Sequence, residues 1–324
     1  MTDKILEVQG LKKSYNGFVA VNGISFHVNR AEIFGFLGPN GAGKTTTINM
    51  LIGLAKISEG RVLYKGKDLT DNIKKAQEII GVVSDESNLY NEMNGFDNLC
   101  FCGALYGLPK REREIKAHGL LELFGLKDAA GKKFMAYSKG MKRKLTIAAA
   151  LIHEPEILFL DEPTTGIDVA SVRQIRNLIT ELNKKGTTIF LTTHYIEEAE
   201  RLCNKVAFID KGEIIKIDSV EQLIKASREK SIIEIQFEPV TYDKTRLLEK
   251  LNKKFPGIEC ILKNDSAIKI VSTNKIDIAP VVNYLSAERL FIYEAKLIRP
   301  SLEDAFVKAT GIEIDLMKKE KEKK

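Results

Sequence analysis

The hydrophobic positions in the N-terminal two thirds of the chain are grouped into short apolar runs that alternate with amphipathic stretches. Three early runs are rich in Val, Ile and Phe and are separated by Gly and Asn, which predicts strands over Ile5–Val8, Val19–Val28 and Glu32–Leu37. A helix is predicted next, over Thr45–Ala55. Two further strand regions follow, over Gly60–Leu69 and Ile79–Ser84.

Residues 91–151 have few β-branched runs and much helical periodicity, as in REREIKAHGLLELFGL, so we interpret them as an inserted helical lobe. Strands and helices then alternate. The order is a strand in EILFLDEP, a helix over Asp168–Lys185, a strand in TTIFLTT, a helix over Ile196–Leu202, and the strands KVAFID and EIIKID. This alternation predicts an α/β fold with a mostly parallel sheet and helices on its faces.

The pattern changes after about Ser219, where the order becomes βαββαβ. The predicted elements are strands over Ser231–Glu238, Ile258–Lys263, Ala267–Val271 and Ile292–Ile298, and helices over Lys244–Lys254 and Ile276–Ser286. That order is typical of a small ferredoxin-like domain. A closing helix begins at Pro300-Ser301, and the end, MKKEKEKK, is interpreted as a solvated tail. The expected division is 1–218, 219–311 and a tail over 312–324.

Composition narrows the class of protein. With 324 residues and 44% hydrophobic residues, the chain can build one large and one smaller packed core. The net charge of +6 is mild for a chain that is 29% charged, so it does not indicate a nucleic-acid partner. The four cysteines are too scattered for a disulfide framework, which favours reduced cytosolic thiols. No run approaches the roughly 18 apolar residues of a membrane span, so a membrane role would require a partner.

The stretch FGFLGPNGAGKTTT carries the strongest chemical signal. Gly38, Gly43, Lys44 and Thr45 match G-x-x-x-x-G-K-[ST] where a strand leads into a helix. In such a loop backbone N–H groups surround phosphate oxygens, the lysine contacts the outer phosphates and the hydroxyl ligates magnesium. We expect the whole loop to bind a nucleoside triphosphate: Gly38, Pro39, Asn40, Gly41, Ala42, Gly43, Lys44, Thr45 and Thr46.

EILFLDEP supplies the acidic residues that such a loop needs. A buried strand would place Asp161 at its carboxyl end, within reach of the magnesium shell. At a strand end the chain can turn Glu162 toward the γ-phosphate, where it could orient water or accept its proton. Alone, Asp-Glu-Pro is a common strand-ending turn; beside the phosphate loop, Glu162 is the candidate general base.

AYSKGMKRKL resembles the LSGGQ signature of the nucleotide-binding subunits of ABC transporters, and the resemblance covers about Ile5–Asp218. Its positions are occupied here by Tyr137, Ser138, Lys139, Gly140 and Met141. Lys139 replaces a glycine and Met141 a glutamine, variants similar to those of bacterial exporter-type subunits. Physically, Ser138 can cap a helix whose positive end accepts an anion.

The resemblance implies the P-loop fold of an ABC cassette, in which an antiparallel β subdomain accompanies the mostly parallel sheet and the helical lobe. It also implies that the ligand is ATP with Mg²⁺ and that two copies pack head to tail. Each nucleotide would then lie between the phosphate loop of one subunit and the signature of the other. Tyr15 lies where the family stacks an aromatic ring on adenine, Asp168 where a loop crosses the dimer interface, and His194 where a histidine contacts the γ-phosphate. Taken singly, Tyr15 and His194 could be ordinary packing residues.

One position departs from the family in a way that bears on the metal. GVVSDESNLY has Asp85 where the family has a glutamine. A carboxylate can ligate magnesium, but it cannot donate the amide hydrogen bond. Asp85 is therefore a candidate metal ligand, with an ordinary surface acid as the alternative.

The resemblance implies an ATPase motor subunit of a membrane exporter. It would act with a second ATP-binding subunit, identical or different, and with a membrane-spanning permease that holds it on the cytoplasmic face of the membrane, without nucleic acid. A soluble ABC-type ATPase acting on ribosomes or DNA is the alternative, although the chain has one phosphate loop, one signature and no heptad array. Intact Glu162 and His194 argue against a regulator that binds nucleotide without turnover. The substrate and the role of the C-terminal domain stay open.

Overall fold

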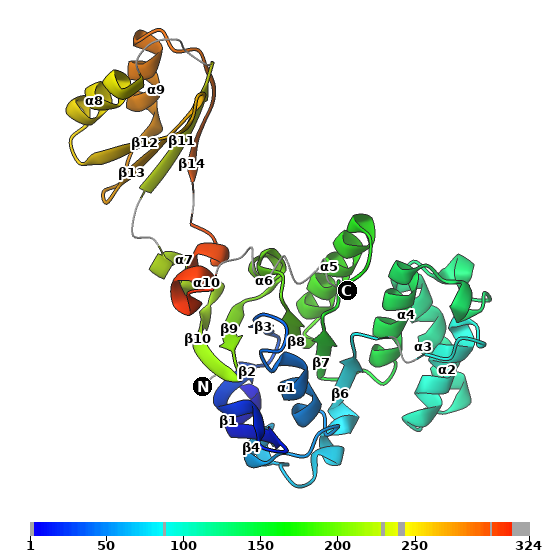
Figure 1. The fold of residues 1–324 in the computed structure, drawn as a ribbon. Helices are drawn as coiled ribbons and strands as arrows, with labels where there is room; N and C mark the ends of the chain where they lie inside the picture. The colour runs from blue at the N-terminus through cyan, green and yellow to red at the C-terminus, as the bar shows by residue number, and fades with distance from the viewer. Residues whose placement is uncertain (1–2, 87–88, 228–230, 239–243, 299, 313–324) are drawn as a thin grey trace. The chain divides into compact units, whose positions relative to one another are not determined.

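The computed structural model describes residues 3–86, 89–227, 231–238, 244–298 and 300–312 (Figure 1). The described residues form two compact units. One contains the residues up to Val220 and those from Ala309 onward, and the other is Glu221–Lys308. The predicted tail MKKEKEKK lies outside the described residues.

A six-stranded sheet forms the centre of the first unit. Its strands lie in the order β10 (Glu213–Ser219), β9 (Lys205–Asp210), β3 (Ile33–Leu37), β8 (Thr188–Thr193), β7 (Ile157–Asp161) and β6 (Ile80–Val83). All neighbouring strands are parallel except β10 and β9. Every residue of β3, β7 and β8 is buried, as expected for strands covered on both faces. The predicted mostly parallel sheet is confirmed.

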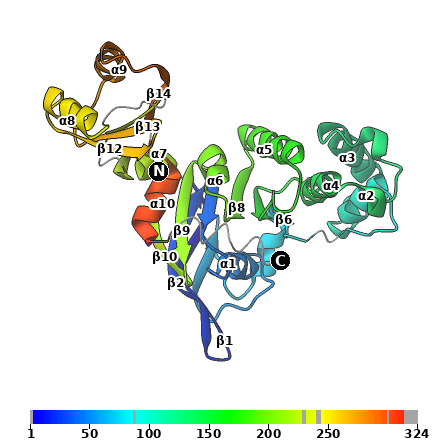
Figure 2. The same ribbon diagram turned by 45° about the horizontal axis from the view of Figure 1, so that its top comes forward.

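Helices cover both faces of this sheet. They include α1 (Lys44–Leu51), α5 (Val169–Lys184) and α6 (Ile196–Leu202). Figures 1 and 2 show α1 on one side of the sheet and α5 and α6 on the other. On α5 the buried residues are Ile175, Leu178, Ile179 and Leu182. Their spacing of three and four residues forms a single apolar stripe, which faces the core.

An aromatic cluster lies on one face of strands β3, β7 and β8. It consists of Phe26, Phe34, Phe36, Phe159 and Phe190, with ring centroids of neighbouring pairs between 5.3 and 5.9 Å apart. Each such pair contributes about 0.5–1.5 kcal/mol beyond the burial of its area. Because Phe26 comes from a different sheet, the cluster joins the two sheets of this unit.

That second sheet is antiparallel. Its order is β2 (Phe18–Asn29), β1 (Lys4–Tyr15), β4 (Glu59–Tyr64) and β5 (Lys67–Asp68). β1 continues to Tyr15, whereas the apolar pattern predicts its end at Val8. Shifts of register after Val8 and Leu11 mark bulges, which carry the strand through a polar stretch that lacks simple alternation.

The helix after the phosphate loop is shorter than predicted. α1 ends at Leu51, with Ile52 as its C-cap, whereas the sequence predicts a helix to Ala55. The backbone N–H groups of Leu54 and Ala55 both donate to the Asn49 carbonyl, at 2.8 and 2.9 Å. This turn takes the place of the last helical turn.

Most residues of the segment 91–151, which lies between β6 and β7 in the chain, are helical. They form α2 (Gly95–Leu105), α3 (Lys110–Leu123), η2 (Lys127–Ala129), η3 (Phe134–Ala136) and α4 (Lys139–Leu151), and η1 (Ile73–Ile79) precedes β6. The Tyr137 hydroxyl donates to the Ala129 carbonyl at 2.7 Å, which joins the start of α4 to the rest of this lobe. Among the described residues, no helix has the length and apolar character that crossing a membrane requires.

Among the described residues, the core of the second unit is an antiparallel sheet with two helices. Its elements are β11 (Ser231–Phe237), α8 (Lys244–Lys254), β12 (Ile258–Asn264), β13 (Ala267–Ser272), α9 (Ile278–Ala287) and β14 (Ile292–Ile298), and the strand order is β12-β13-β11-β14. Alternate residues Ile233, Ile235 and Phe237 enter its core. Two further helices, α7 (Val220–Ser227) and α10 (Leu302–Thr310), flank these elements in the chain. The sequence pattern did not predict α7.

Candidate nucleotide-binding and catalytic site

The segments that carry the predicted site residues meet at one edge of the six-stranded sheet. The parallel register pairs Leu37 with Thr193 and Asp161 with Thr192. The carboxyl ends of β3, β7 and β8 therefore lie side by side. In open α/β sheets ligands bind at this edge, because the loops that leave parallel strands converge there.

The phosphate loop runs from the end of β3 to the start of α1. Gly43 has φ 100°, and a Cβ at this position would lie 2.7 Å from the Ala20 carbonyl oxygen, so only glycine fits. Lys44 is 6% exposed, and its Nζ donates to the carbonyls of Gly38 at 2.9 Å and Pro39 at 3.1 Å. The loop therefore closes around the lysine ammonium.

The first turn of α1 presents hydroxyl groups beside this loop. Thr45 is exposed and Thr46 is half-buried. Thr47 points inward, and its hydroxyl donates to the Gly43 carbonyl at 2.8 Å. The N-terminus of α1 also carries the partial positive charge of the helix dipole. The loop and the helix start together can bind an anion.

Glu162 leaves β7 with an unusual backbone conformation. Its φ is 47°, which costs a residue other than glycine about 1–3 kcal/mol. Its N–H lies 3.1 Å from the Thr192 hydroxyl and 3.2 Å from the Thr192 carbonyl, so the neighbouring strand holds the turned backbone. This turn brings the Glu162 side chain to the same edge as Lys44.

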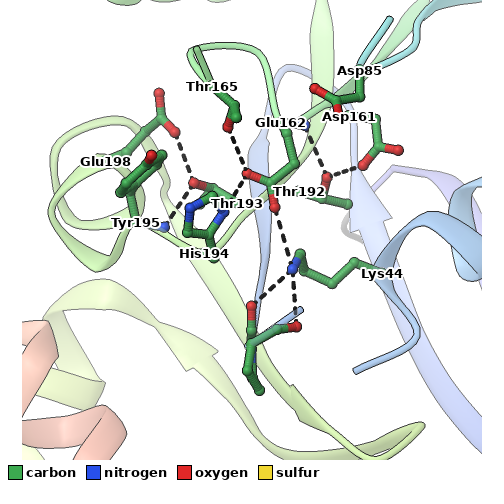
Figure 3. Close-up of polar contacts among 12 residues, drawn as sticks. Lys44, Asp85, Asp161, Glu162, Thr165, Thr192, Thr193, His194, Tyr195 and Glu198 are labelled. Atoms are coloured by element: carbon green, nitrogen blue, oxygen red, sulfur yellow. Dashed lines mark hydrogen bonds and ion pairs between the residues drawn. The ribbon is translucent and has the colours of Figure 1, made fainter. Parts of the chain in front are cut away.

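The Glu162 carboxylate lies between the side chains of Lys44 and His194 (Figure 3). Lys44 Nζ is 3.2 Å from Glu162 Oε1, and His194 Nδ1 is 2.7 Å from Glu162 Oε2. The Thr165 hydroxyl also donates to Oε2, at 3.1 Å. Burial opposes ionisation of this carboxyl, but the hydrogen bond with His194 and the charge of Lys44 outweigh it and lower the pKa of Glu162. Glu162 is therefore ionised at neutral pH.

Asp161 is the last residue of β7 and is 4% exposed. The Thr192 hydroxyl donates to Asp161 Oδ1, which fixes the carboxylate. Among the described residues there is no group of three or more His, Cys, Asp or Glu placed to hold a metal ion. Magnesium does not need such a group, because it is commonly bound by one or two carboxylates, water and substrate phosphates. The oxygen donors at this edge fit that ion.

A buried glutamate supports the residues around His194. Glu198 is fully buried on α6, and its Oε2 accepts a hydrogen bond from the Thr193 hydroxyl at 2.8 Å. A hydrogen bond from Thr164 also reaches this carboxylate. Arg176 Nε lies 3.9 Å from Oε1. Burial raises the pKa of Glu198. The Glu198 carboxylate thus holds Thr164, which follows Glu162 in the chain, and Thr193, which precedes His194.

The signature residues begin α4. The Ser138 hydroxyl accepts a hydrogen bond from the Met141 N–H at 3.2 Å and so caps the helix. Gly140 packs against α5, since a Cβ there would lie 2.1 Å from Ser171 Oγ. Asp168 caps α5, accepting from the Ser171 N–H at 2.9 Å and hydroxyl at 2.7 Å. Ser138 and Asp168 therefore belong to neighbouring helix starts.

This helix start is separate from the phosphate loop. Ser138 and Lys139 are exposed, and within the described part of the chain no hydrogen bond or ion pair joins Ser138–Met141 to Lys44, Glu162 or His194. Tyr15 is likewise outside the polar cluster. It ends β1 with 46% of its surface exposed, and Lys13 Nζ lies 4.6 Å from its ring centroid.

Asp85 follows β6 and is exposed. Its backbone carbonyl accepts a hydrogen bond from Arg143 Nη2 at 2.6 Å, and its carboxylate Oδ1 lies 3.5 Å from the same nitrogen. Partial loss of hydration, with the charges of Asp161 and Glu162, raises the pKa of Asp85, and Arg143 opposes this rise. Figure 3 shows the carboxylates of Asp85 and Asp161 on the same side of the site.

Sequence reasoning did not find several polar residues of this site, among them Thr165, Thr192, Glu198 and Arg143. Glu198 lies four residues after His194, but Glu197 and Glu200 lie beside it with no pattern that separates them. Arg143 stands between two lysines in a basic run. A polar residue of an amphipathic helix that is buried by tertiary contacts leaves no distinct signal in the sequence.

Comparison with known proteins gives the family. Residues 21–165 match the ABC transporter family. The uncharacterized ABC transporter ATP-binding protein YhcH of Bacillus subtilis is 36% identical over 310 residues, which cover 95% of this chain and 96% of that protein. The Nod factor export ATP-binding protein I of Ralstonia nicotianae is 34% identical, over 96% of this chain and 95% of that protein.

A solved structure agrees. Its subject is cbiO1 from Clostridium perfringens, described as part of the ABC transporter complex cbiONQ. It matches with a TM-score of 0.64 and 28% identity, over 78% of this chain and 96% of that one. The chain therefore belongs to the ABC transporter family and is one of its ATP-binding, ATP-hydrolysing subunits.

Proposed function

We propose that this chain is the motor subunit of an exporter, and that ATP with Mg²⁺ binds at the edge where Lys44, Glu162 and His194 meet. The observation that carries the proposal is the contact of Glu162 with both Lys44 and His194, at 3.2 and 2.7 Å. A phosphate-binding lysine, a base and a histidine on three different segments are the groups that phosphoryl transfer to water needs.

ATP binding would change the partners of Lys44. Its ammonium is paired with Glu162 and with two loop carbonyls. The outer phosphates carry more negative charge than one carboxylate, so they would compete for the lysine and release Glu162 Oε1. Glu162 could then orient an attacking water and accept its proton, while His194 contacts the γ-phosphate. The remaining loop residues would surround the phosphates, and Tyr15 would stack on the base.

The metal would be held by Thr45 and Asp161, with Asp85 as a further ligand. When bound, it would neutralise charge on the β- and γ-phosphates. The support is the donor set, since the fixed carboxylate of Asp161 and the exposed hydroxyl of Thr45 both belong to segments at this edge. Oxygen atoms of this kind are the ligands that magnesium prefers.

A second ATP-binding subunit, identical or different, would complete each site. Ser138, Lys139, Gly140 and Met141 would contact the nucleotide held by that subunit, and Asp168 would lie at the interface. The exposure of Ser138 and Lys139 at a capped helix start supports this arrangement, because the N–H groups and dipole there favour an anion. Hydrolysis would then separate the two subunits.

A membrane-spanning permease is the second partner that we propose, and it would hold this chain at the cytoplasmic face of the membrane. Support comes from the relatives, since one is named for export and the solved structure for a transporter complex. These findings give no support to action on ribosomes or DNA.

We also propose that the chain divides into residues 1–218, 219–311 and 312–324, and that residues 219–311 form a ferredoxin-like domain. The order βαββαβ and the strand order β12-β13-β11-β14 support that assignment.

Replacing Glu162 by glutamine tests the proposal. Glu162→Gln keeps the size of the side chain but removes the base, so kcat should fall by about 10²–10⁴-fold while ATP affinity is retained. The variant should also trap an ATP-bound dimer, seen by size-exclusion chromatography. Glu197→Gln, at an exposed position on α6, is the control. Unchanged turnover in Glu162→Gln would exclude Glu162 as the base.

A further inference from the structure

Arg143 extends from the signature helix into the catalytic edge. It lies on α4, five residues after Ser138, and is 7% exposed. Nη1 donates to the Ser84 carbonyl at 2.6 Å, and Nη2 donates to the Asp85 carbonyl at 2.6 Å. Nη2 also lies 3.5 Å from the Glu162 carbonyl oxygen. One guanidinium therefore reaches three backbone carbonyls on two segments outside its own helix.

The chemistry of these contacts favours arginine. A guanidinium is planar and presents its N–H groups as a fixed fork, so bonds to two consecutive carbonyls set both the position and the direction of the loop. Burial lowers the pKa of Arg143, while the charges of Asp85 and Asp161 oppose that effect. The carboxylates of this edge thus offset part, but not all, of the cost of burying the guanidinium charge.

The Asp85 side chain adds an ionic contact with Arg143 that a neutral side chain could not make. Its carboxylate Oδ1 lies 3.5 Å from Arg143 Nη2, in addition to the bond through its carbonyl. The loop after β6 is therefore joined to α4 through backbone and side chain together. A movement of α4 would be passed to Asp85 and to the backbone of Glu162.

We propose that Arg143 is a positioning residue that couples the signature helix to the Glu162 of the same subunit. The inference rests on the proposed function, in which Ser138 contacts the nucleotide of the second subunit. In this role Arg143 acts through backbone carbonyls and not through the nucleotide. It transmits the position of α4 to the Ser84–Asp85 loop and to Glu162, so that the base is aligned only when the signature helix is engaged.

The test compares Arg143→Gln and Arg143→Lys with Arg111→Gln, an exposed arginine of α3 in the same lobe. Arg143→Gln should lower kcat by about tenfold to a hundredfold, the effect of a misplaced catalytic group, while the dissociation constant for ATP stays within about twofold. Hydrogen exchange of the amides of residues 84–86 should become faster. Arg143→Lys retains the charge without the fork and should recover only part of the rate.

The outcomes separate this inference from the proposed function. If Glu162→Gln abolishes turnover but both Arg143 variants match Arg111→Gln in kcat and in exchange, the coupling role is wrong and the proposed function stands. If Glu162→Gln turns over normally, Glu162 is not the base and the catalytic arrangement in the proposed function is wrong. If Arg143→Gln does not fold, Arg143→Lys decides: full activity with unchanged exchange at residues 84–86 overturns the proposal.

Discussion

Lys44→Met should destabilise the nucleotide-free chain, because Lys44 has structural contacts before ATP arrives. Methionine keeps most of the side-chain volume and removes the ammonium. The variant loses hydrogen bonds to the Gly38 and Pro39 carbonyls, at 2.9 and 3.1 Å, and an ion pair with Glu162 at 3.2 Å. The loss of stability that follows from these missing contacts can be measured without nucleotide.

The expected magnitude follows from these contacts. A hydrogen bond from a charged donor contributes about 1.5–3 kcal/mol, but the variant no longer has to bury the ammonium. Glu162 retains its hydrogen bond with His194. We therefore expect a net loss of about 2 kcal/mol in the free energy of unfolding. For a domain of this size the melting temperature falls about 2–4 °C per kcal/mol, so the expected decrease is about 4–8 °C.

Thermal unfolding followed by circular dichroism, without ATP or magnesium, measures this decrease. Lys74→Met, at an exposed lysine, is the control and should change stability by less than about 0.5 kcal/mol. Combining Lys44→Met with Glu162→Gln completes a double-mutant cycle, whose coupling free energy should be about 1–2 kcal/mol. A melting temperature equal to that of Lys74→Met, or additive effects in the cycle, would refute the pairing.

Two further predictions concern Glu198 and Asp85. Burial raises the pKa of Glu198, so the folded chain binds the proton of this carboxyl more tightly than the unfolded chain does. This proton binding adds to the free energy of unfolding below the ordinary pKa of 4.5, and the contribution is lost as the pH rises from 4.5 to the pKa of the folded chain. Glu198→Gln does not ionise there, so urea unfolding should show its stability relative to the wild type increasing across that window; a constant difference would contradict the assignment. Asp85→Ala should raise the magnesium concentration for half-maximal ATPase activity by about tenfold, and superimposable magnesium titrations would exclude Asp85 as a ligand.

The sequence predicted the central strands well because burial on both faces leaves a plain signal. EILFLDEP and TTIFLTT are continuous apolar runs, and both became strands in which every residue is buried. The boundaries of β1 and α1 were less predictable. Bulges carry β1 through Lys12-Lys13, and a turn around the Asn49 carbonyl shortens α1. Both features depend on neighbouring segments rather than on local periodicity.

In the candidate site, too, the residues that belong to local motifs were predictable and those that depend on distant contacts were not. Lys44 and Asp161 follow from motifs whose spacing is set by the chemistry of phosphate and magnesium, and register brings their segments to one edge. Arg143 and Glu198 could not be predicted, because their roles come from contacts with residues far away in the chain. A basic residue and an acidic residue on amphipathic helices are ordinarily solvated. Only the packing of those helices against the sheet buries them.

The ATPase rate of wild type and Ser138→Arg across a range of subunit concentrations tests the central claim most directly. If a second subunit completes each site, the specific activity of the wild type rises with concentration, and Ser138→Arg binds ATP with normal affinity but does not hydrolyse it. Full activity that is independent of concentration, with Ser138→Arg as active as the wild type, would contradict the account.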